Sequence, residues 1–267
     1  MGQLTVAGVS MTERLRRTLA GAVMCAAAFA AACGGGNAGG EAQPAAPAVV
    51  TNPVDAATAG SISGSITLQG TPPAPQPIKM NSDPYCVQQG GATTQSFVIG
   101  SGGTLQNVFV YVKDGLGDLK FPVPEAQVVF DQKGCMYQPH VLGIQAGQTL
   151  EITSSDDTLH NVHAVPEKNR EFNRAHAMKE IKHTHVFSTR EVMIPFKCDV
   201  HNWMTAFIGV LDHPFYAVSG ADGAFSLKGL PPGTYTIEAW HEKLGTQTQT
   251  VTLGAKEAKD VAFTFKI

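Results

Sequence analysis

A short segment in the C-terminal half of the chain offers three metal donors at regular spacing. Cys198, His201 and Met204 follow one another at steps of three residues. A thiolate, an imidazole and a thioether together suit copper, whereas zinc sites usually contain more cysteine and do not take a neutral thioether. The segment therefore indicates a copper site, and a further donor has to come from elsewhere in the chain.

A histidine pair upstream supplies a candidate for that donor. His160 and His163 stand three residues apart. In an extended segment, residues at this spacing point to opposite faces, so the two rings cannot easily reach one metal ion. We therefore expect only one of them to be a ligand.

Together the two segments resemble the cupredoxin (type 1 blue copper) family. The C-x2-H-x2-M loop that starts at Cys198 is of the plastocyanin/amicyanin type, and the segment around His160 is similar to the strand end that precedes it in this family. The resemblance implies one type 1 copper ion with His160, Cys198 and His201 as equatorial ligands and Met204 as the axial ligand.

Strands on either side of the loop have to hold these donors in place. Apolar runs over 192–196 and 206–211 predict strands that enter and leave the loop. Residues 149–152 predict a strand that precedes His160. A tight loop between two strands suits copper, because the ligands then move little when the oxidation state changes.

The end of the chain resembles the carboxypeptidase regulatory-like (transthyretin-like) β-sandwich. This resemblance rests on residues 221–227 and 230–240, an Asp-Gly-x-Phe segment followed by a Pro-Gly turn and a strand. It implies that residues 60–68 and 108–112 are the opening strands of the same sandwich. We therefore expect an all-β fold with a Greek-key cupredoxin β-sandwich inserted in, or fused to, a second small β-sandwich.

Composition agrees with an all-β chain and excludes one class of partner. The chain contains 28 Gly and 16 Pro, and few of its segments read as helices, which predicts many turns. Lys and Arg number 19 against 22 Asp and Glu, and the formal net charge is -3. This balance gives no electrostatic basis for binding nucleic acid.

The N-terminus is typical of an export signal. Arginines at 14, 16 and 17 precede the apolar run 19–32, which is too short to span a membrane and suits a secretory signal. The run ends at Cys33 in a segment similar to a bacterial lipoprotein cleavage box, which implies lipidation of Cys33 and a membrane anchor. Gly34 points by the same analogy to the outer membrane, and Met11 is an alternative start.

These signals divide the chain into five parts. We expect a lipoprotein-type signal peptide at 1–33, a flexible linker at 34–59 and a cupredoxin-like copper domain at 126–212. N-terminal strands of the carboxypeptidase regulatory-like sandwich are expected at 60–125, and its C-terminal strands at 213–267.

The remaining cysteines indicate a disulfide. Cys25 lies in the apolar run and would be removed with the signal. With Cys33 assigned to lipid and Cys198 to copper, Cys86 and Cys135 remain as a pair in an oxidising compartment. The alternative is a separate metal site containing Cys135 and His140, for which no third donor is evident.

Residues 166–187 form the least readable stretch of the chain. They contain four further possible copper donors, His176, Met178, His183 and His185. A second copper site and a solvated polar loop are both compatible with this composition.

The donor set predicts an electron carrier rather than an enzyme. All four positions around the metal are filled by protein side chains, so no position is open for a substrate. The cupredoxin resemblance implies that His201 reaches the surface in an apolar docking patch, for which Trp203 and Phe207 are candidates. The expected partners are redox proteins such as periplasmic cytochromes or oxidoreductases, and the expected location is the periplasm or cell surface.

Two other functions remain open on the sequence. One is a copper-binding or copper-delivery lipoprotein that uses the same donors, and the other is a metal-free structural sandwich at the cell surface. The donors His160, Cys198, His201 and Met204 argue against the metal-free form.

Overall fold

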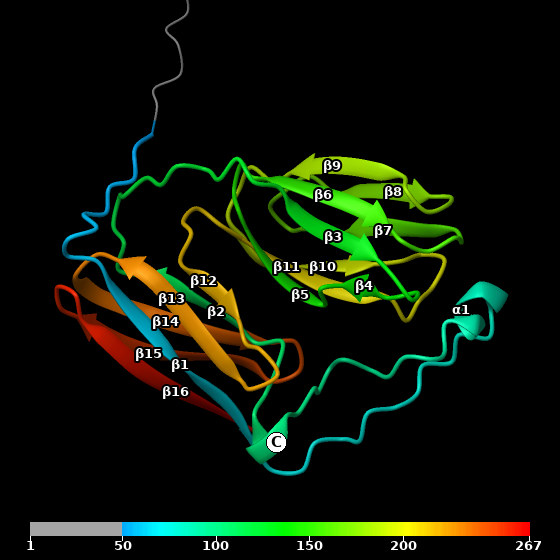
Figure 1. Cartoon of the computed structure of the whole chain (residues 1–267), viewed down its shortest axis with the longest axis horizontal. Coiled ribbons are helices and arrows are strands. Elements are labelled where there is room, and N and C mark those ends of the chain that lie inside the picture. Colours follow the sequence, from blue (N-terminus) through cyan, green and yellow to red (C-terminus); the bar gives the residue numbers. More distant parts are fainter. Residues whose placement is uncertain (1–49) are drawn as a thin grey trace, which may run out of the picture. The chain divides into compact units, whose positions relative to one another are not determined.

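The computed structural model describes residues 50–267. The expected signal peptide, Cys33 and most of the expected linker lie outside this part of the chain. Within residues 50–267, no helix has the length and apolar character that a bilayer span requires. The regular secondary structure of the described residues consists almost entirely of strands, in four sheets (Figure 1).

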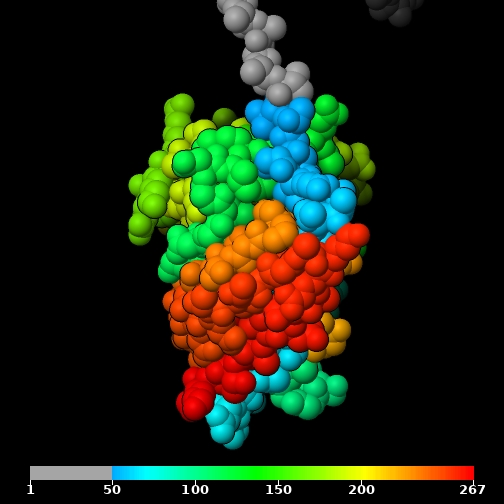
Figure 2. Space-filling model, turned by 90° about the vertical axis from the view of Figure 1, so that its left-hand side faces the viewer, coloured from blue at the N-terminus to red at the C-terminus, as the bar shows by residue number. Residues whose placement is uncertain are grey.

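Two of these sheets form a sandwich from both ends of the described chain. One sheet has the order β13-β1-β16 and the other β12-β2-β14-β15. Their strands are β1 (Gly60–Gln69), β2 (Phe109–Asp114), β12 (Tyr216–Val218), β13 (Ala224–Leu230), β14 (Gly233–His241), β15 (Gly245–Leu253) and β16 (Ala258–Lys266). The C-terminal strands, orange to red in Figure 2, cover the face of this sandwich that is turned to the viewer.

Alternation of apolar residues accounts for this pairing. Ile62 and Ile66 of β1 are fully buried, and so are Phe263 and Phe265 of β16, while the residues between them are more exposed. Successive residues of a strand point to opposite faces, so each strand lines one common core with half of its side chains. Strand β1 also pairs in parallel with β16 over its length, which joins the two ends of the described chain.

The other two sheets form a second sandwich, which holds the predicted metal loop. One has the order β5-β11-β10-β7-β8 and the other β4-β3-β6-β9. The strands of the first are β5 (Val141–Gln145), β11 (Thr205–Leu211), β10 (Glu191–Lys197), β7 (His160–Ala164) and β8 (Phe172–His176). Those of the second are β4 (Tyr137–Gln138), β3 (Val128–Gln132), β6 (Thr149–Ser154) and β9 (Lys182–Val186). Pairs β5–β11 and β3–β6 are parallel and the others antiparallel.

The second sandwich is inserted into the first. Strands β3 to β11 are consecutive in the sequence, and they stand between β2 and β12, which pair directly with each other. The fold is therefore the expected all-β arrangement of one β-sandwich within another.

Two glycines leave room on the second sandwich for aromatic side chains of the first sandwich to pack. Gly143 and Gly209 are paired on adjacent strands β5 and β11. A Cβ atom on Gly209 would lie 2.5 Å from Cζ of Phe109, and one on Gly143 would lie 2.3 Å from Cδ2 of Tyr216. Glycine at these positions allows the aromatic rings to approach the backbone.

We predict that Gly209→Ala destabilises the protein, because the added methyl group overpacks this contact. The expected loss is about 1–3 kcal/mol in the free energy of unfolding, measured by urea denaturation. The double variant Gly209→Ala/Phe109→Leu removes the ring that the methyl group meets and should lose less than the sum of the two single changes. Additive losses would contradict the proposed contact.

The connection between β1 and β2 reaches the inserted sandwich through a covalent bond. It contains the short helix α1 (Pro84–Gln88), and a disulfide joins Cys86 to Cys135, which follows β3. Asp83 caps α1 by accepting a hydrogen bond from the N–H group of Tyr85 at 2.8 Å. We call residues 70–100, which include α1, the cover segment.

Candidate metal centre

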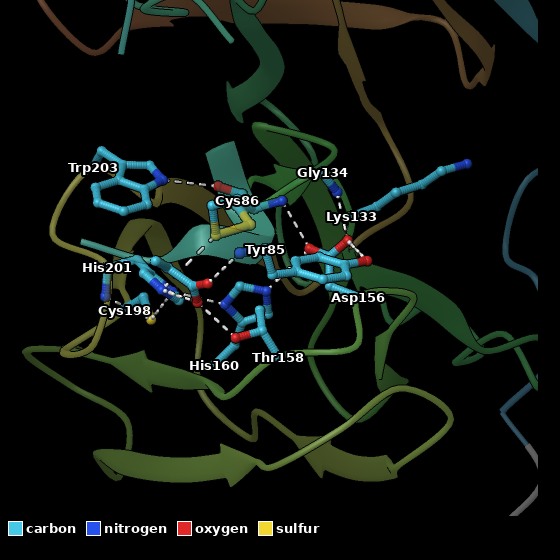
Figure 3. Close-up of a disulfide and its surroundings, with 12 residues drawn as sticks. Tyr85, Cys86, Lys133, Gly134, Asp156, Thr158, His160, Cys198, His201 and Trp203 are labelled. Carbon is cyan, nitrogen blue, oxygen red and sulfur yellow. Dashed lines mark hydrogen bonds and ion pairs between the residues drawn. A yellow bond between two sulfur atoms is a disulfide. The ribbon is translucent and has the colours of Figure 1, made fainter. Parts of the chain in front are cut away.

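Three of the predicted ligands converge at one end of the inserted sandwich. His160 is the first residue of β7, Cys198 follows β10, and His201 lies in the loop between β10 and β11. The distance from His160 Nδ1 to His201 Nδ1 is 2.9 Å, and that from Cys198 Sγ to His201 Nδ1 is 4.0 Å. The three side chains are at most 2% exposed, and Figure 3 shows them beside one another below the disulfide.

Met204, the predicted axial ligand, closes the loop that carries these donors. Its N–H group donates to the carbonyl of His201 at 2.9 Å, and its carbonyl accepts from the N–H group of Cys198 at 3.2 Å. Its side chain is fully buried in the same apolar cluster as Cys198. The loop is therefore a tight turn whose two ends are held by backbone hydrogen bonds.

Two carboxylates orient the imidazole rings. Asp156 Oδ2 lies 3.0 Å from Nε2 of His160, and Asp83 Oδ2 lies 3.1 Å from Nε2 of His201. In each ring the Nε2–H group donates to a carboxylate, so Nδ1 faces the common centre. A carboxylate behind a metal-binding histidine selects the tautomer and the ring orientation that a metal requires. The sequence analysis missed both aspartates as parts of the site.

The two imidazole rings of the centre differ in their pKa. Burial opposes a charge on His160, but hydrogen bonds with Asp156 and Cys198 raise the pKa of His160 to about 9. Burial and the neighbouring charge of His160 lower the pKa of His201. These shifts favour His160 Nδ1–H as the donor to Nδ1 of His201 in the metal-free protein.

Cys198 is prepared to act as a thiolate. Burial raises its pKa, but hydrogen bonds with His160 and with backbone N–H groups outweigh burial and lower it. The N–H groups of Asn161 and His201 point at Cys198 Sγ at 3.5 and 3.3 Å. A thiolate with two oriented imidazoles suits copper, so the residues present fit a copper ion.

The side chain of Asn161 ties the two halves of the centre together. Its Oδ1 accepts from the N–H groups of Asp199 at 2.6 Å and Val200 at 3.3 Å, which directly follow Cys198. Asn161 itself is only 6% exposed. It therefore positions the Cys198 loop relative to β7.

We predict that Asn161→Ala destabilises the metal-free protein by about 1–3 kcal/mol, because the buried side-chain amide that accepts from two backbone N–H groups is lost. Urea unfolding followed by circular dichroism measures this loss. The exposed Asn173 also donates to Asp199, at 2.6 Å, so Asn173→Ala is a matched control with an expected effect below about 1 kcal/mol. Equal effects of the two changes would contradict the role given to Asn161.

The structure buries His201, contrary to the expectation that it forms an exposed edge. His201 is 2% exposed, because Asp83 and Cys86 of the cover segment pack against it. Trp203 is half-buried, with its ring centroid 4.9 Å from that of His201 and its Nε1–H group donating to the carbonyl of Cys135 at 3.0 Å.

The second docking candidate, Phe207, does not form an open apolar patch either. It is half-buried, and its ring lies 5.1 Å from that of Trp240 in the first sandwich. A family-based expectation of an exposed patch misses this contact, because Trp240 belongs to a domain that a free cupredoxin lacks.

Cys86 and Cys135 form a disulfide in the structure. His140, the alternative partner of Cys135, instead lies 2.6 Å from Oε1 of Glu242 through Nε2 and 3.0 Å from the carbonyl of Thr205 through Nδ1. Both ring nitrogens of His140 are therefore engaged away from Cys135.

The other histidines lie outside the centre. His163 is partly exposed between Asp199, at 2.9 Å, and Glu171, at 2.7 Å. His176 is buried beside Gln132, with the ring of His183 4.7 Å from its own.

The candidate donors of a second copper site do not gather in one place. Met178 is 56% exposed. Within residues 50–267, none of His176, His183 and His185 belongs to a set of three converging His, Cys, Asp or Glu donors. The region is nevertheless not a plain loop, because it forms β8 and β9.

Comparison with known proteins gives a family match for one part of the chain. Residues 207–266 match the family described as carboxypeptidase regulatory-like domain. No curated protein matches the chain.

Several solved structures are similar to part of the chain. A purple cupredoxin from Nitrosopumilus maritimus is 22% identical, with 32% of this chain and 99% of that chain covered and a TM-score of 0.27. A reduced mutant of amicyanin is 23% identical, with 33% and 85% covered and a TM-score of 0.29. A copper-containing nitrite reductase from Thermus scotoductus SA-01 is 17% identical, with 38% of this chain but only 26% of that chain covered and a TM-score of 0.31.

Proposed function

We propose that the protein is a copper-binding electron carrier with a mononuclear site of the His₂Cys(Met) type. The observation that carries this proposal is the buried convergence of His160 Nδ1, Cys198 Sγ and His201 Nδ1, whose donor atoms all lie within 4.8 Å of one another. Trigonal His₂Cys sites with a weak axial methionine are electron-transfer copper sites. Met204 is the proposed axial ligand.

A bound copper ion would supply a one-electron redox couple, and the protein would supply rigidity. Asp156 and Asp83 keep the two rings oriented, and Asn161 holds the Cys198 loop, so the ligands would change little between oxidation states. Burial excludes water from the donors. We propose no enzymatic reaction, because this donor set leaves no position for a substrate.

The electron path proposed here differs from an exposed histidine edge. Because the cover segment buries His201, we place the exchange point at Trp203, which is half-buried and packs against that ring in a tilted arrangement. Other redox proteins, such as periplasmic cytochromes or oxidoreductases, are the proposed partners. A small and transient contact is sufficient for such an exchange.

We also propose that the protein is exported and anchored to a membrane. The basic and apolar N-terminal segments and Cys33 support this location, with the outer membrane favoured by Gly34. The lipid at Cys33 would hold the two sandwiches at the membrane surface through the Gly/Ala/Pro-rich linker.

Copper delivery is a second candidate function, and one observation favours it. Two further sets of donors, Asp83-Cys86-His201 and Cys135-Asp156-His160, share their histidines with the proposed site. Their cysteines are joined in the Cys86–Cys135 disulfide, so both sets require its reduction. Neighbouring donor sets suit a copper ion that is transferred from one set to the next rather than one that is bound permanently.

The visible spectrum of the purified protein on addition of Cu(II) tests these functions. An intense blue charge-transfer band that ascorbate removes and reoxidation restores would support an electron carrier. Tight Cu(I) binding without this band would favour delivery. A protein that binds neither oxidation state of copper would leave only a structural sandwich.

A further inference from the structure

The cover segment is tied to the metal centre through Asp83. One carboxylate oxygen of Asp83 lies 3.1 Å from Nε2 of His201 and accepts from the hydroxyl of Thr158 at 2.6 Å. Cys86 follows Asp83 by three residues, and its Sγ lies 3.9 Å from Nε2 of His201. The Cys86 sulfur of the disulfide therefore lies next to His201, one of the proposed ligands.

Asp156 ties the second half of the disulfide to the other ring. Its carboxylate accepts from the N–H groups of Gly134 at 2.8 Å and Cys135 at 2.7 Å, and it lies 3.0 Å from Nε2 of His160. Each proposed histidine ligand thus shares a carboxylate with one of the two loops that the disulfide joins. Figure 3 shows the disulfide above the rings of His160 and His201.

The disulfide is surrounded by soft donors. Cys86 and Cys135 are fully buried, and they pack in one cluster with Met80 and Met136, which are 3% and 7% exposed. Thiolates and thioethers select Cu(I) among the common biological metals. Reduction of the disulfide would therefore place two thiols and two thioethers together, next to His201.

Few buried apolar contacts hold the cover segment in place, and its other contacts are hydrogen bonds and half-buried side chains such as Phe97. Its only helix, α1, has five residues, and Val87 on it is 53% exposed. Apart from the two cysteines, the buried apolar residues of this cluster are Met80 and Met136, and four half-buried residues pack against them: Ile78, Tyr85, Ala92 and Trp203. Segments with few buried contacts open at a lower free energy than the core, so a reductant could reach the disulfide.

We propose that the Cys86–Cys135 disulfide is a reducible latch, and that its dithiol form binds Cu(I) through Cys86, Cys135, Met80 and Met136 at the entrance to the proposed copper site. A protein dithiol gives two electrons and two protons, the Cys86–Cys135 S–S bond breaks to two thiols, and the donor becomes a disulfide. Cu(I) then replaces the thiol protons, which pass to solvent. The proposal deepens the copper function and rests on it for the role of the bound ion.

Competition for Cu(I) with a chromophoric chelator, without oxygen, tests the site in the purified full chain. The protein is used with its disulfide intact or after reduction by a phosphine. Oxidised wild-type protein should bind one equivalent, and reduced protein two. In Cys198→Ser the inner site lacks its thiolate, so the oxidised form should bind none and the reduced form one.

Variants identify which side chains bind the additional ion. In the Cys198→Ser background, Cys86→Ser/Cys135→Ser should abolish reduction-dependent binding, whereas Met80→Leu/Met136→Leu should keep the packing and weaken it. The same low binding by oxidised and reduced Cys198→Ser would overturn the proposal. So would a reduced chain that loses its β-sheet circular dichroism, because the proposed site needs a folded dithiol form.

These outcomes separate the two proposals. An additional equivalent in reduced Cys198→Ser supports the dithiol site even if oxidised wild-type protein binds no copper, a result that would defeat the proposed electron carrier alone. One equivalent in oxidised wild-type protein with no increase on reduction would support the inner site and defeat the latch.

Discussion

We expect Cys198→Ser to abolish the intense blue absorption of the copper-loaded protein. That band requires charge transfer from a thiolate to Cu(II), and a serine oxygen is a harder donor that cannot give it. Cys198 is the only cysteine without a disulfide partner within residues 50–267, so no other described thiolate can replace it. The visible spectrum of the two proteins, recorded with one equivalent of Cu(II), measures the loss.

A matched variant separates the ligands from nearby histidines. His163 follows His160 by three residues but lies outside the centre, in contact with Asp199 and Glu171. His163→Ala should keep the band, whereas His160→Ala should lose it. A blue band in Cys198→Ser, or a band lost in His163→Ala but kept in His160→Ala, would contradict the assigned ligand set.

Local signals were sufficient to predict three of the four candidate donors. Cys198, His201 and Met204 lie on one short loop, so their spacing already shows that they lie close together. His160 required more, because only the resemblance selected it over His163. The structure brings His160, Cys198 and His201 together and buries Met204 beside Cys198.

The contact between the cover segment and His201 could not be predicted from residue spacing. Asp83 and His201 are 118 residues apart in sequence, and the cover segment is a loop without hydrophobic periodicity. Pattern analysis detects elements that bury one face, whereas contacts between a polar loop and a distant site leave no period in the sequence. The expected exposure of His201 was therefore wrong, although its place in the donor set agreed with the geometry.

Strands β8 and β9 were missed for a related reason. Most of their side chains are polar, and in β9 the half-buried positions are His183 and His185 rather than aliphatic residues. The ring of His185 packs on Phe172, with the centroids 4.2 Å apart. Histidine here lines the edge of the core, a role that a hydrophobic pattern does not register.

We expect removal of the disulfide to cause the largest loss of stability among these changes. The bond joins residues 49 positions apart, and closing a loop of this length lowers the entropy of the unfolded chain. For Cys86→Ala/Cys135→Ala the expected loss is about 4 kcal/mol in the free energy of unfolding, measured by urea denaturation of the metal-free protein.

The two tryptophans show which part of the protein is destabilised when the disulfide is removed. Trp203 donates to the carbonyl of Cys135 beside the disulfide, whereas Trp240 lies on β14 of the first sandwich. When Trp240→Phe is added to Cys86→Ala/Cys135→Ala, the fluorescence of Trp203 should change at a lower urea concentration than the circular dichroism, because the cover segment opens before the sheets unfold. The Trp240→Phe protein with its disulfide intact should show one common transition by fluorescence and by circular dichroism. A loss below about 1 kcal/mol with coincident transitions would mean that packing, not the disulfide, holds the cover segment over His201.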